Sequence, residues 1–201
     1  MAVKANAETI VEGKAGATPR DRYAELLVIV IVAVALIVAW GVKAGAQARA
    51  VHINIDGFQA SYGHNWIREQ VSAPTILTIT DPGAGARFRT TISVQKFANS
   101  DSNEDMARAL NQARIQEQEL FKFIKGEAIQ WRGRETYRNH FAYVYVNPDL
   151  LNSQVPVVLH GVDYVFQHGA ATYVITLLAD ESVYDQAIDD FERFLALVTP
   201  G

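Results

Sequence analysis

The sequence predicts an α+β domain, an antiparallel sheet flanked by helices, that follows one N-terminal transmembrane helix. Three patterns predict this fold class: an uncharged apolar run over Leu26–Val42, later segments in which apolar and polar residues alternate, and two amphipathic helical segments. The chain has 201 residues. About 150 remain for the domain once the tail and the apolar run are set aside, which is close to the most common domain size.

The apolar run is long enough to cross a bilayer as a helix. Its seventeen residues include no charge and no proline. They span roughly 25 Å as a helix, and flanking alanines extend this length toward the roughly 30 Å of the hydrocarbon core. Apolar side chains go all round the helix, which argues against a surface helix of a small domain. We therefore predict a transmembrane helix over 24–44, with these anchor residues: Tyr23, Leu26, Leu36, Trp40 and Lys43.

A cleaved signal peptide is the alternative interpretation of this segment. Ala46-Gln47-Ala48 has the A-x-A form of a cleavage site, but the run exceeds the usual apolar core of about 7–15 residues. Four Lys and Arg residues precede the run and two follow it closely, so the positive-inside rule places the tail in the cytoplasm. The expected organisation is a disordered cytoplasmic tail (1–23), the helix (24–44), a spacer (45–50) and an extracytoplasmic domain (51–201).

Alternating apolar residues predict the strands of the domain, and Asp56-Gly57 predicts a tight turn between the first two. The strands should form two antiparallel meanders, the first with one buried face. The predicted strands are Val51–Ile55, Phe58–Tyr62, Thr75–Thr80, Phe88–Phe97, Ala128–Arg132, Arg138–Val146, Val155–Phe166 and Thr172–Leu178.

Two helices complete the predicted domain. The first has Ser102 as N-cap with Asp105 three residues later, and Gly126 as its stop signal. The last has Ser182 as N-cap with Asp185 three residues later. Its apolar face consists of Tyr184, Ile188, Phe191, Leu195 and Val198.

Two stretches of the domain resemble PsbP-like domains. These are Gly57–Trp66, with its alternating run ending in an aromatic residue, and Ala171–Ala179 followed by Tyr184 and Phe191. The resemblance covers about residues 55–198 and implies an α/β/α sandwich that serves as an extrinsic accessory subunit or binding module. The chain departs from the family pattern at Gly63, where proline is usual, and in its uncleaved anchor. The resemblance implies no catalytic residue.

A small basic and aromatic patch is the best candidate for a partner-binding surface, with a solvated hairpin as its alternative. The patch consists of Trp131, Arg132, Arg134, Tyr137 and Arg138. It stands out because residues 51–201 contain 12 Lys and Arg against 18 Asp and Glu, an acidic balance that argues against nucleic acid or anionic lipid as a partner. A one-sided row at Phe141, Tyr143 and Tyr145 is expected to lie in the core rather than on an exposed docking surface.

The sequence contains no motif of a hydrolase, a P-loop or a zinc protease, and it lacks cysteine. His140, His160 and His168 fall on neighbouring predicted strands, so they could meet around a metal, but packing of His160 and hairpin capping by His168 are the favoured explanation. Acidic residues of the last helix, such as Asp185 and Asp190, suit its N-terminus and solvent face, with a weak calcium site as the alternative. We predict no metal, no cofactor and no catalysis.

Three function classes remain open. The leading hypothesis is a non-catalytic accessory subunit of a larger membrane protein complex, anchored in the lipid bilayer by its single helix. The alternative is a solitary membrane-tethered module that binds a small or lipidic ligand. An enzyme is disfavoured, since the sequence shows neither a nucleophile nor a metal constellation.

Overall fold

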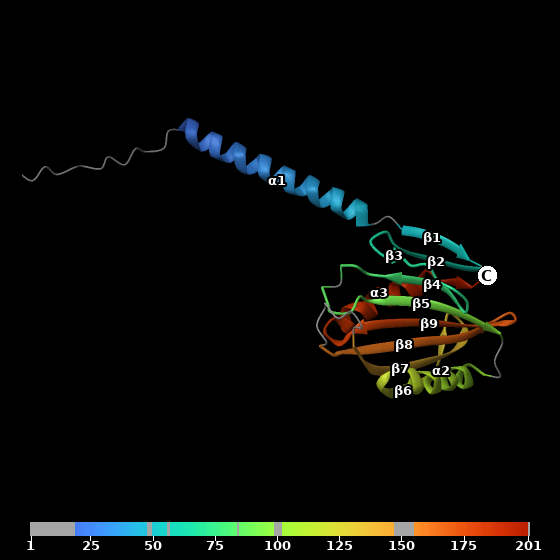
Figure 1. Cartoon of the computed structure of the whole chain (residues 1–201). Coiled ribbons are helices and arrows are strands. Elements are labelled where there is room, and N and C mark those ends of the chain that lie inside the picture. The colour runs from blue at the N-terminus through green and yellow to red at the C-terminus, as the bar shows by residue number, and fades with distance from the viewer. Residues whose placement is uncertain are drawn as a thin grey trace, which may run out of the picture. The chain divides into compact units, whose positions relative to one another are not determined.

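The computed structural model describes residues 19–47, 50–55, 57–83, 85–98, 102–146 and 155–200 (Figure 1). The chain divides into two compact units between Ala46 and Gln47. The first contains helix α1 and the second contains the α+β domain. We describe each unit by itself.

Helix α1 (Pro19–Gln47) includes the whole predicted span 24–44 and extends beyond it at both ends. Residues 19–23, which the sequence places in the tail, belong to this helix, and Pro19 suits its first turn. Among the predicted anchor residues, Leu36 and Trp40 are exposed, whereas the side chains of Tyr23, Leu26 and Lys43 lie outside the described set. Within the described residues, no helix combines the length and apolarity needed to cross a membrane.

Helix α1 also takes up part of the predicted spacer 45–50. The helix ends at Gln47 and strand β1 (Ala50–Ile55) begins three residues later. Residues 1–18 of the predicted tail and 48–49 of the spacer lie outside the described residues.

The strands of the domain that the structure describes form two antiparallel sheets rather than two meanders in one sheet. The smaller sheet has the order β1-β2-β10, with β2 at Phe58–Gly63 and β10 at Thr199–Pro200. The larger has the order β3-β4-β5-β9-β8-β7-β6. Its strands are β3 (Ile67–Arg68), β4 (Thr75–Thr80), β5 (Thr91–Ala98), β6 (Glu119–Trp131), β7 (Arg134–Tyr145), β8 (Val157–His168) and β9 (Ala171–Asp180). The C-terminal segment pairs with β2, which the sequence did not predict.

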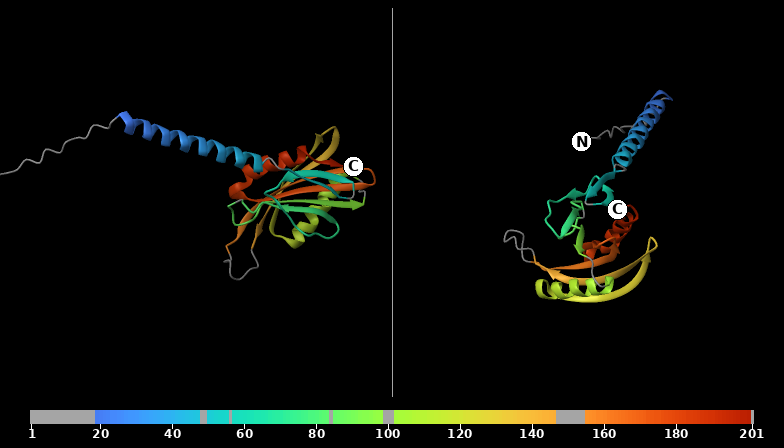
Figure 2. Two further views of the ribbon diagram at one scale, coloured as in Figure 1. Left: turned by 90° about the horizontal axis from the view of Figure 1, so that it is seen from above. Right: turned by 90° about the vertical axis from the view of Figure 1, so that its right-hand side faces the viewer.

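Helices α2 (Asn103–Glu117) and α3 (Tyr184–Ala196) cover opposite faces of the larger sheet, as Figures 1 and 2 show. Successive side chains of β8 point to opposite faces of the sheet, one toward α3 and the next toward α2. Val162 packs in the cluster that includes Phe191 of α3, whereas Val165 packs with Ala107 of α2. The predicted sandwich of helices on an antiparallel sheet is therefore confirmed.

A buried polar cluster ties α2 to the sheet. Asp163, whose side chain is 0% exposed, forms a bidentate ion pair with Arg114 of α2, at 2.6 and 2.9 Å. Its oxygens also accept hydrogen bonds from Asn139 (2.8 Å) and Thr176 (2.7 Å). Asn139 in turn exchanges amide hydrogen bonds with Asn111 of α2, at 2.9 and 3.1 Å. We call these five residues the Asp163 cluster. Because both carboxylate oxygens have charged or polar donors, the cost of burying the charge is offset.

The predicted continuation of α2 to Gly126 is wrong. The helix ends at Glu117, and β6 begins at Glu119 and runs for 13 residues. Gly126 is a strand glycine: a Cβ atom there would lie 2.2 Å from the hydroxyl oxygen of Tyr137, which packs across it. The glycine is therefore required by a close approach and not by a helix end.

One predicted helix cap is confirmed and the other is wrong. Ser102 accepts a hydrogen bond from the backbone N–H of Asp105 at 3.0 Å and donates to its carboxylate at 2.7 Å. At the last helix, Ser182 is not the cap: the N-cap position of α3 is Val183, which makes no side-chain cap hydrogen bond, and Asp180 caps the turn that precedes the helix. Asp180 accepts hydrogen bonds from the backbone N–H and the hydroxyl of Ser182, and a 3₁₀ turn at Glu181–Val183 precedes α3.

Replacing Asp163 with alanine should lower the free energy of unfolding of the domain by about 3–5 kcal/mol, because Arg114 would keep its charge in a largely buried position without a partner. Urea unfolding of the full chain, followed by tryptophan fluorescence, measures this loss. Arg108→Ala is the control: it removes an exposed ion pair with Glu104 on the same helix and should cost about 0–1 kcal/mol. Equal losses in the two variants would contradict the role assigned to the Asp163 cluster.

Candidate partner-binding surface

The five residues of the predicted basic and aromatic patch do not form one surface. Trp131 is half-buried on the α3 side, with its ring centroid 5.1 Å from that of Phe166. Arg132 and Gly133 have φ values of 51° and 76°, as the two central residues of a type I′ hairpin turn require. The guanidinium of Arg132 donates to the backbone carbonyl of Val198. The turn is therefore fixed to the end of the chain.

The other two arginines of the patch also have partners within the domain. Arg134 lies 2.9 Å from Nδ1 of His168, which joins the β6–β7 and β8–β9 hairpins. Arg138 donates from Nε to Glu127 at 3.0 Å, and this hydrogen bond raises the pKa of Arg138. The basic groups that made the patch attractive thus stabilise hairpins.

Tyr137 alone faces the other side of the sheet, where it lines a groove beside α2. The groove encloses about 400 Å³, and the residues that shape it include Ala107, Asn111, Ile115, Phe123 and Tyr137. Burial raises the pKa of the Tyr137 hydroxyl. A pre-formed hollow between a helix and a strand can accept a side chain or a small ligand.

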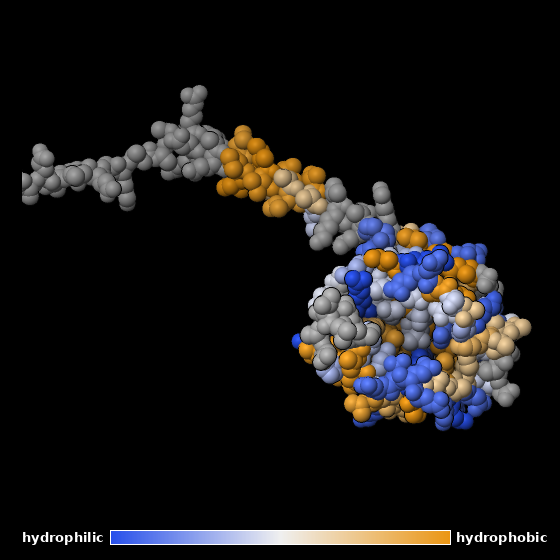
Figure 3. All heavy atoms as spheres, viewed as in Figure 1, coloured by the Kyte–Doolittle hydropathy of each residue, from blue (hydrophilic) through white to orange (hydrophobic). Residues whose placement is uncertain are grey.

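Large apolar side chains are exposed in and beside this groove. Ile115 of α2 is 60% exposed, and Leu120, Phe123 and Ile124 of β6 are 79%, 48% and 48% exposed. We call these four residues and Tyr137 the α2–β6 patch. In Figure 3 apolar and charged surfaces lie side by side at the lower edge of the domain, where Figure 1 places α2 and β6. Clustered apolar exposure of this kind marks a contact surface.

Strand β6 is the outer strand of the larger sheet, and its pairing with β7 is interrupted twice near the patch. The register shifts between Glu119 and Lys122 and again between Phe123 and Lys125, and Leu120 has a positive φ of 51°. Such irregularities disfavour the addition of another strand at the edge. The patch therefore offers side chains, rather than backbone hydrogen bonds, to a partner.

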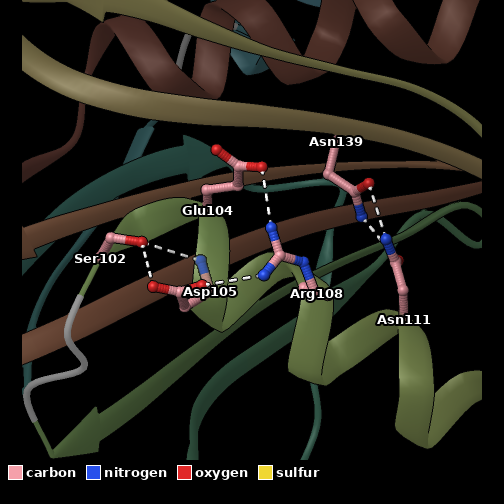
Figure 4. A network of polar contacts seen from close by, with 6 residues as sticks. All are labelled: Ser102, Glu104, Asp105, Arg108, Asn111 and Asn139. Atoms are coloured by element: carbon pink, nitrogen blue, oxygen red, sulfur yellow. Dashed lines mark hydrogen bonds and ion pairs between the residues drawn. The ribbon is translucent and has the colours of Figure 1, made fainter.

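Polar contacts hold α2 in the position that forms the groove (Figure 4). The Ser102 cap fixes the start of the helix, and Arg108 pairs with Glu104 and Asp105 at 3.0 and 3.2 Å on its surface. The reciprocal hydrogen bonds between Asn111 and Asn139 then fix its middle to β7. These contacts fix the groove wall at the start and in the middle of α2.

The α2–β6 patch is not predicted from the sequence because the predicted first helix of the domain continues to Gly126, over residues that form β6 in the structure. In a helix, Leu120 and Phe121 extend an apolar stripe toward the core. In the strand, Phe121 stacks on Phe141 while Leu120 and Phe123 remain exposed. The one available signal was the clustering of apolar residues at Leu120–Ile124, which is typical of a strand.

The described residues contain no group of three or more His, Asp or Glu side chains placed to hold a metal ion. His168 faces Arg134, and His160 lies between the Tyr184 ring (5.2 Å between centroids) and Glu181 (3.8 Å). Burial, followed by the positive charge of Arg138, lowers the pKa of His140. Among the acidic residues, Asp180 caps the 3₁₀ turn.

The aromatic row on β7 is confirmed as part of the core. Phe141 and Tyr143 are buried, and Tyr145 packs partly buried against the same cluster. The guanidinium of Arg114 lies 3.9 Å from the centroid of Phe141, which joins this row to the Asp163 cluster.

Comparison with solved structures shows which fold this architecture represents. The cyanobacterial PsbP protein CyanoP from Synechocystis sp. PCC 6803 superposes with a TM-score of 0.57 and 15% identity, covering 78% of this chain and 94% of that protein. The domain has a PsbP-like fold. The Ran-binding protein Mog1p of Saccharomyces cerevisiae matches with a TM-score of 0.52 and 8% identity, over 76% of this chain and 95% of Mog1p. No family model and no curated protein matches the sequence.

Glu127 of the PsbP-like domain should titrate far below an ordinary glutamate. Hydrogen bonds from Lys125 (2.6 Å) and then Arg138 lower its pKa from 4.5 to about 2. A lowered pKa means that the stabilisation by these ion pairs is complete above about pH 4.5 and is lost as the pH falls through about 2. Carboxyl ¹³C NMR of the full chain should give this midpoint.

Two variants make the titration of Glu127 specific. Lys125→Gln should move the midpoint upward toward 4.5, because Lys125 makes the largest contribution. Lys122→Gln, which removes a neighbouring lysine that does not contact Glu127 in the structure, should leave it near 2. A wild-type midpoint near 4.5 would show that the two ion pairs do not form in solution.

Proposed function

We propose that this protein is a non-catalytic accessory subunit of a larger membrane protein complex. A single N-terminal helix anchors it in the bilayer, and its PsbP-like domain lies outside the cytoplasm and docks on the complex. The observation that carries the proposal is the α2–β6 patch, an apolar surface around a pre-formed groove on an otherwise acidic domain.

The composition of the patch suits a protein partner. Phe123 and Tyr137 offer aromatic anchors, Ile115 lines the same groove, and Leu120 and Ile124 add exposed aliphatic side chains on β6. Aromatic side chains in a pocket surrounded by apolar contacts are typical of the residues that dominate binding energy at interfaces. A complex that covered the patch would remove these side chains from water, which is favourable.

The exposed surface of α1 supports the anchor. Every side chain described in the helix, over 27–41, is exposed, and most of them are large and apolar, as the orange surface of Figure 3 illustrates. A helix that is apolar all round is stable when lipid or other helices surround it. The excess of basic residues before the helix supports an extracytoplasmic domain.

The alternative function is a solitary, membrane-tethered module that binds a small or lipidic ligand. The groove volume of about 400 Å³ falls within the range of small-molecule sites, and its lining combines apolar side chains with polar and charged groups from α2. An accessory subunit has a stoichiometric protein partner in native membranes, whereas a solitary module has none, so this observation distinguishes the two functions.

The accessory-subunit function predicts that the α2–β6 patch is needed for assembly. Ile115→Ser and Phe123→Ser should each reduce co-purification of the full chain with its complex by about tenfold, because each removes an apolar contact at the centre of the interface. Gentle detergent extraction, native gel separation and mass identification of the co-migrating chains measure the effect.

Matched controls come from exposed apolar residues elsewhere on the domain. Ile67→Ser and Leu197→Ser, at 52% and 53% exposure, should leave co-purification unchanged. Migration of the wild-type chain alone would reject the subunit function and favour the ligand-binding module. Equal losses from all four variants would show that the patch is the wrong surface.

The anchor predicts that the full chain resists extraction from membranes by alkaline carbonate, because lipid surrounds its apolar helix. Its intact mass should be near 22.2 kDa. A mature chain that starts at Arg49 would show instead that the segment is a cleaved signal peptide.

A further inference from the structure

A second surface of the domain, on the α3 side of β6, β7 and β8, contains two of the domain's three lysines and one arginine. Residues 51–201 contain three lysines, Lys96, Lys122 and Lys125, and two of them lie on β6. An accumulation of cations on a domain with a net negative charge requires an explanation.

The strand register brings these cations together with two histidines. Lys125 pairs directly with His140 of β7, and Lys122 pairs with Ala142, which itself pairs with His160 of β8. Side chains opposite each other on neighbouring strands lie about 4.5–5.5 Å apart at Cβ. Arg138, two residues before His140, shares the same face of β7. We call the set Lys122, Lys125, Arg138, His140 and His160 the β6–β8 basic patch.

The basic patch is accessible, and part of it is already oriented. Lys122 is exposed, Lys125 is 59% exposed and Arg138 is 33% exposed. The Glu127 carboxylate pairs with the Lys125 ammonium and accepts a hydrogen bond from Arg138, so it holds these two side chains next to each other. Lys122, Lys125 and Arg138 carry three positive charges against the one negative charge of Glu127, which leaves an excess of positive charge. The two histidine rings of the patch donate N–H hydrogen bonds when they are protonated.

We propose that the β6–β8 basic patch binds an oxyanion of the phosphate class, as a free phosphate compound or as the phosphate of a lipid headgroup. Lysine and arginine donors on two adjacent strands, with histidines on β7 and β8, suit the several oxygens of one phosphate group. The site is separate from the α2–β6 patch, which lies on the opposite face of the sheet. The inference therefore goes beyond the proposed function and does not depend on it.

The charge state of His140 provides a specific signal of binding. Burial and the positive charge of Arg138 keep its pKa below the ordinary value, and Lys125 acts in the same direction. A bound anion offsets the charge of both cations, so it raises the pKa of His140, and binding strengthens as the pH falls. Other titratable or charged groups on the elements packed around this histidine are Lys122 and Glu127 on β6, His160, Asp163 and Tyr164 on β8, Glu181 in the 3₁₀ turn and Tyr184 at the start of α3.

The test is a titration of the full chain, in neutral detergent, with sodium phosphate at constant ionic strength. Histidine ring and backbone NMR signals should shift in a saturable way at His140, Lys125 and their neighbours, and the pKa of His140 should rise. The double variant Lys122→Gln/Lys125→Gln should weaken binding by about tenfold or more, because it removes two charged donors. Lys96→Gln, which removes the same type of charge from β5, should not weaken it.

The outcomes are decisive. Non-saturable shifts, an unchanged His140 pKa, or an equal effect of Lys96→Gln would overturn the proposal.

A second arm places the full chain in phosphatidylcholine bilayers with or without phosphatidylglycerol and omits free phosphate. The same His140 shift in the anionic bilayer identifies a lipid headgroup as the source, whereas a shift with free phosphate alone identifies a soluble phosphate compound.

Discussion

The ion pair between Arg114 and Asp163 is the interaction on which the position of α2 depends. Among the described residues of this helix only Ala107 is fully buried, so apolar burial alone ties α2 weakly to the sheet. The bidentate pair, the two asparagines and Thr176 supply the missing attachment, and these donors offset the cost of burying the carboxylate. Because α2 forms one wall of the groove, the Asp163 cluster also determines the shape of the candidate binding surface.

The two faces of the β6–β7 hairpin present different kinds of side chain. The face toward α2 presents Phe123 and Tyr137 beside the groove, and the opposite face presents Lys125 and Arg138, joined through Glu127. Alternation along the two strands produces this separation. A long hairpin at the edge of the sheet thus contributes to two chemically different surfaces on opposite faces.

Sequence periodicity predicted the fold class and most of the elements, because each strand with one buried face alternates clearly. Thr75–Thr80 was predicted with its observed bounds, and Ser102 was predicted as a cap. The sequence did not predict the end of α2, because Leu120 and Phe121 continue its apolar stripe and Gly126 resembles a stop signal. Only the three-dimensional contact with Tyr137 explains that glycine. The candidate site was missed for the same reason, and the arginines of the predicted patch proved to be bonded within the domain, which spacing along the chain cannot reveal.

Site-specific photo-cross-linking in native membranes tests the central claim most directly. The full chain would carry benzoylphenylalanine in place of Phe123, in the groove, or in place of Ile67, on the far edge of the sheet. Docking through the α2–β6 patch predicts one discrete protein adduct from position 123 and none from position 67. Adducts to lipid alone at position 123, or the same protein adduct from both positions, would contradict the claim that the α2–β6 patch docks this domain on a membrane complex.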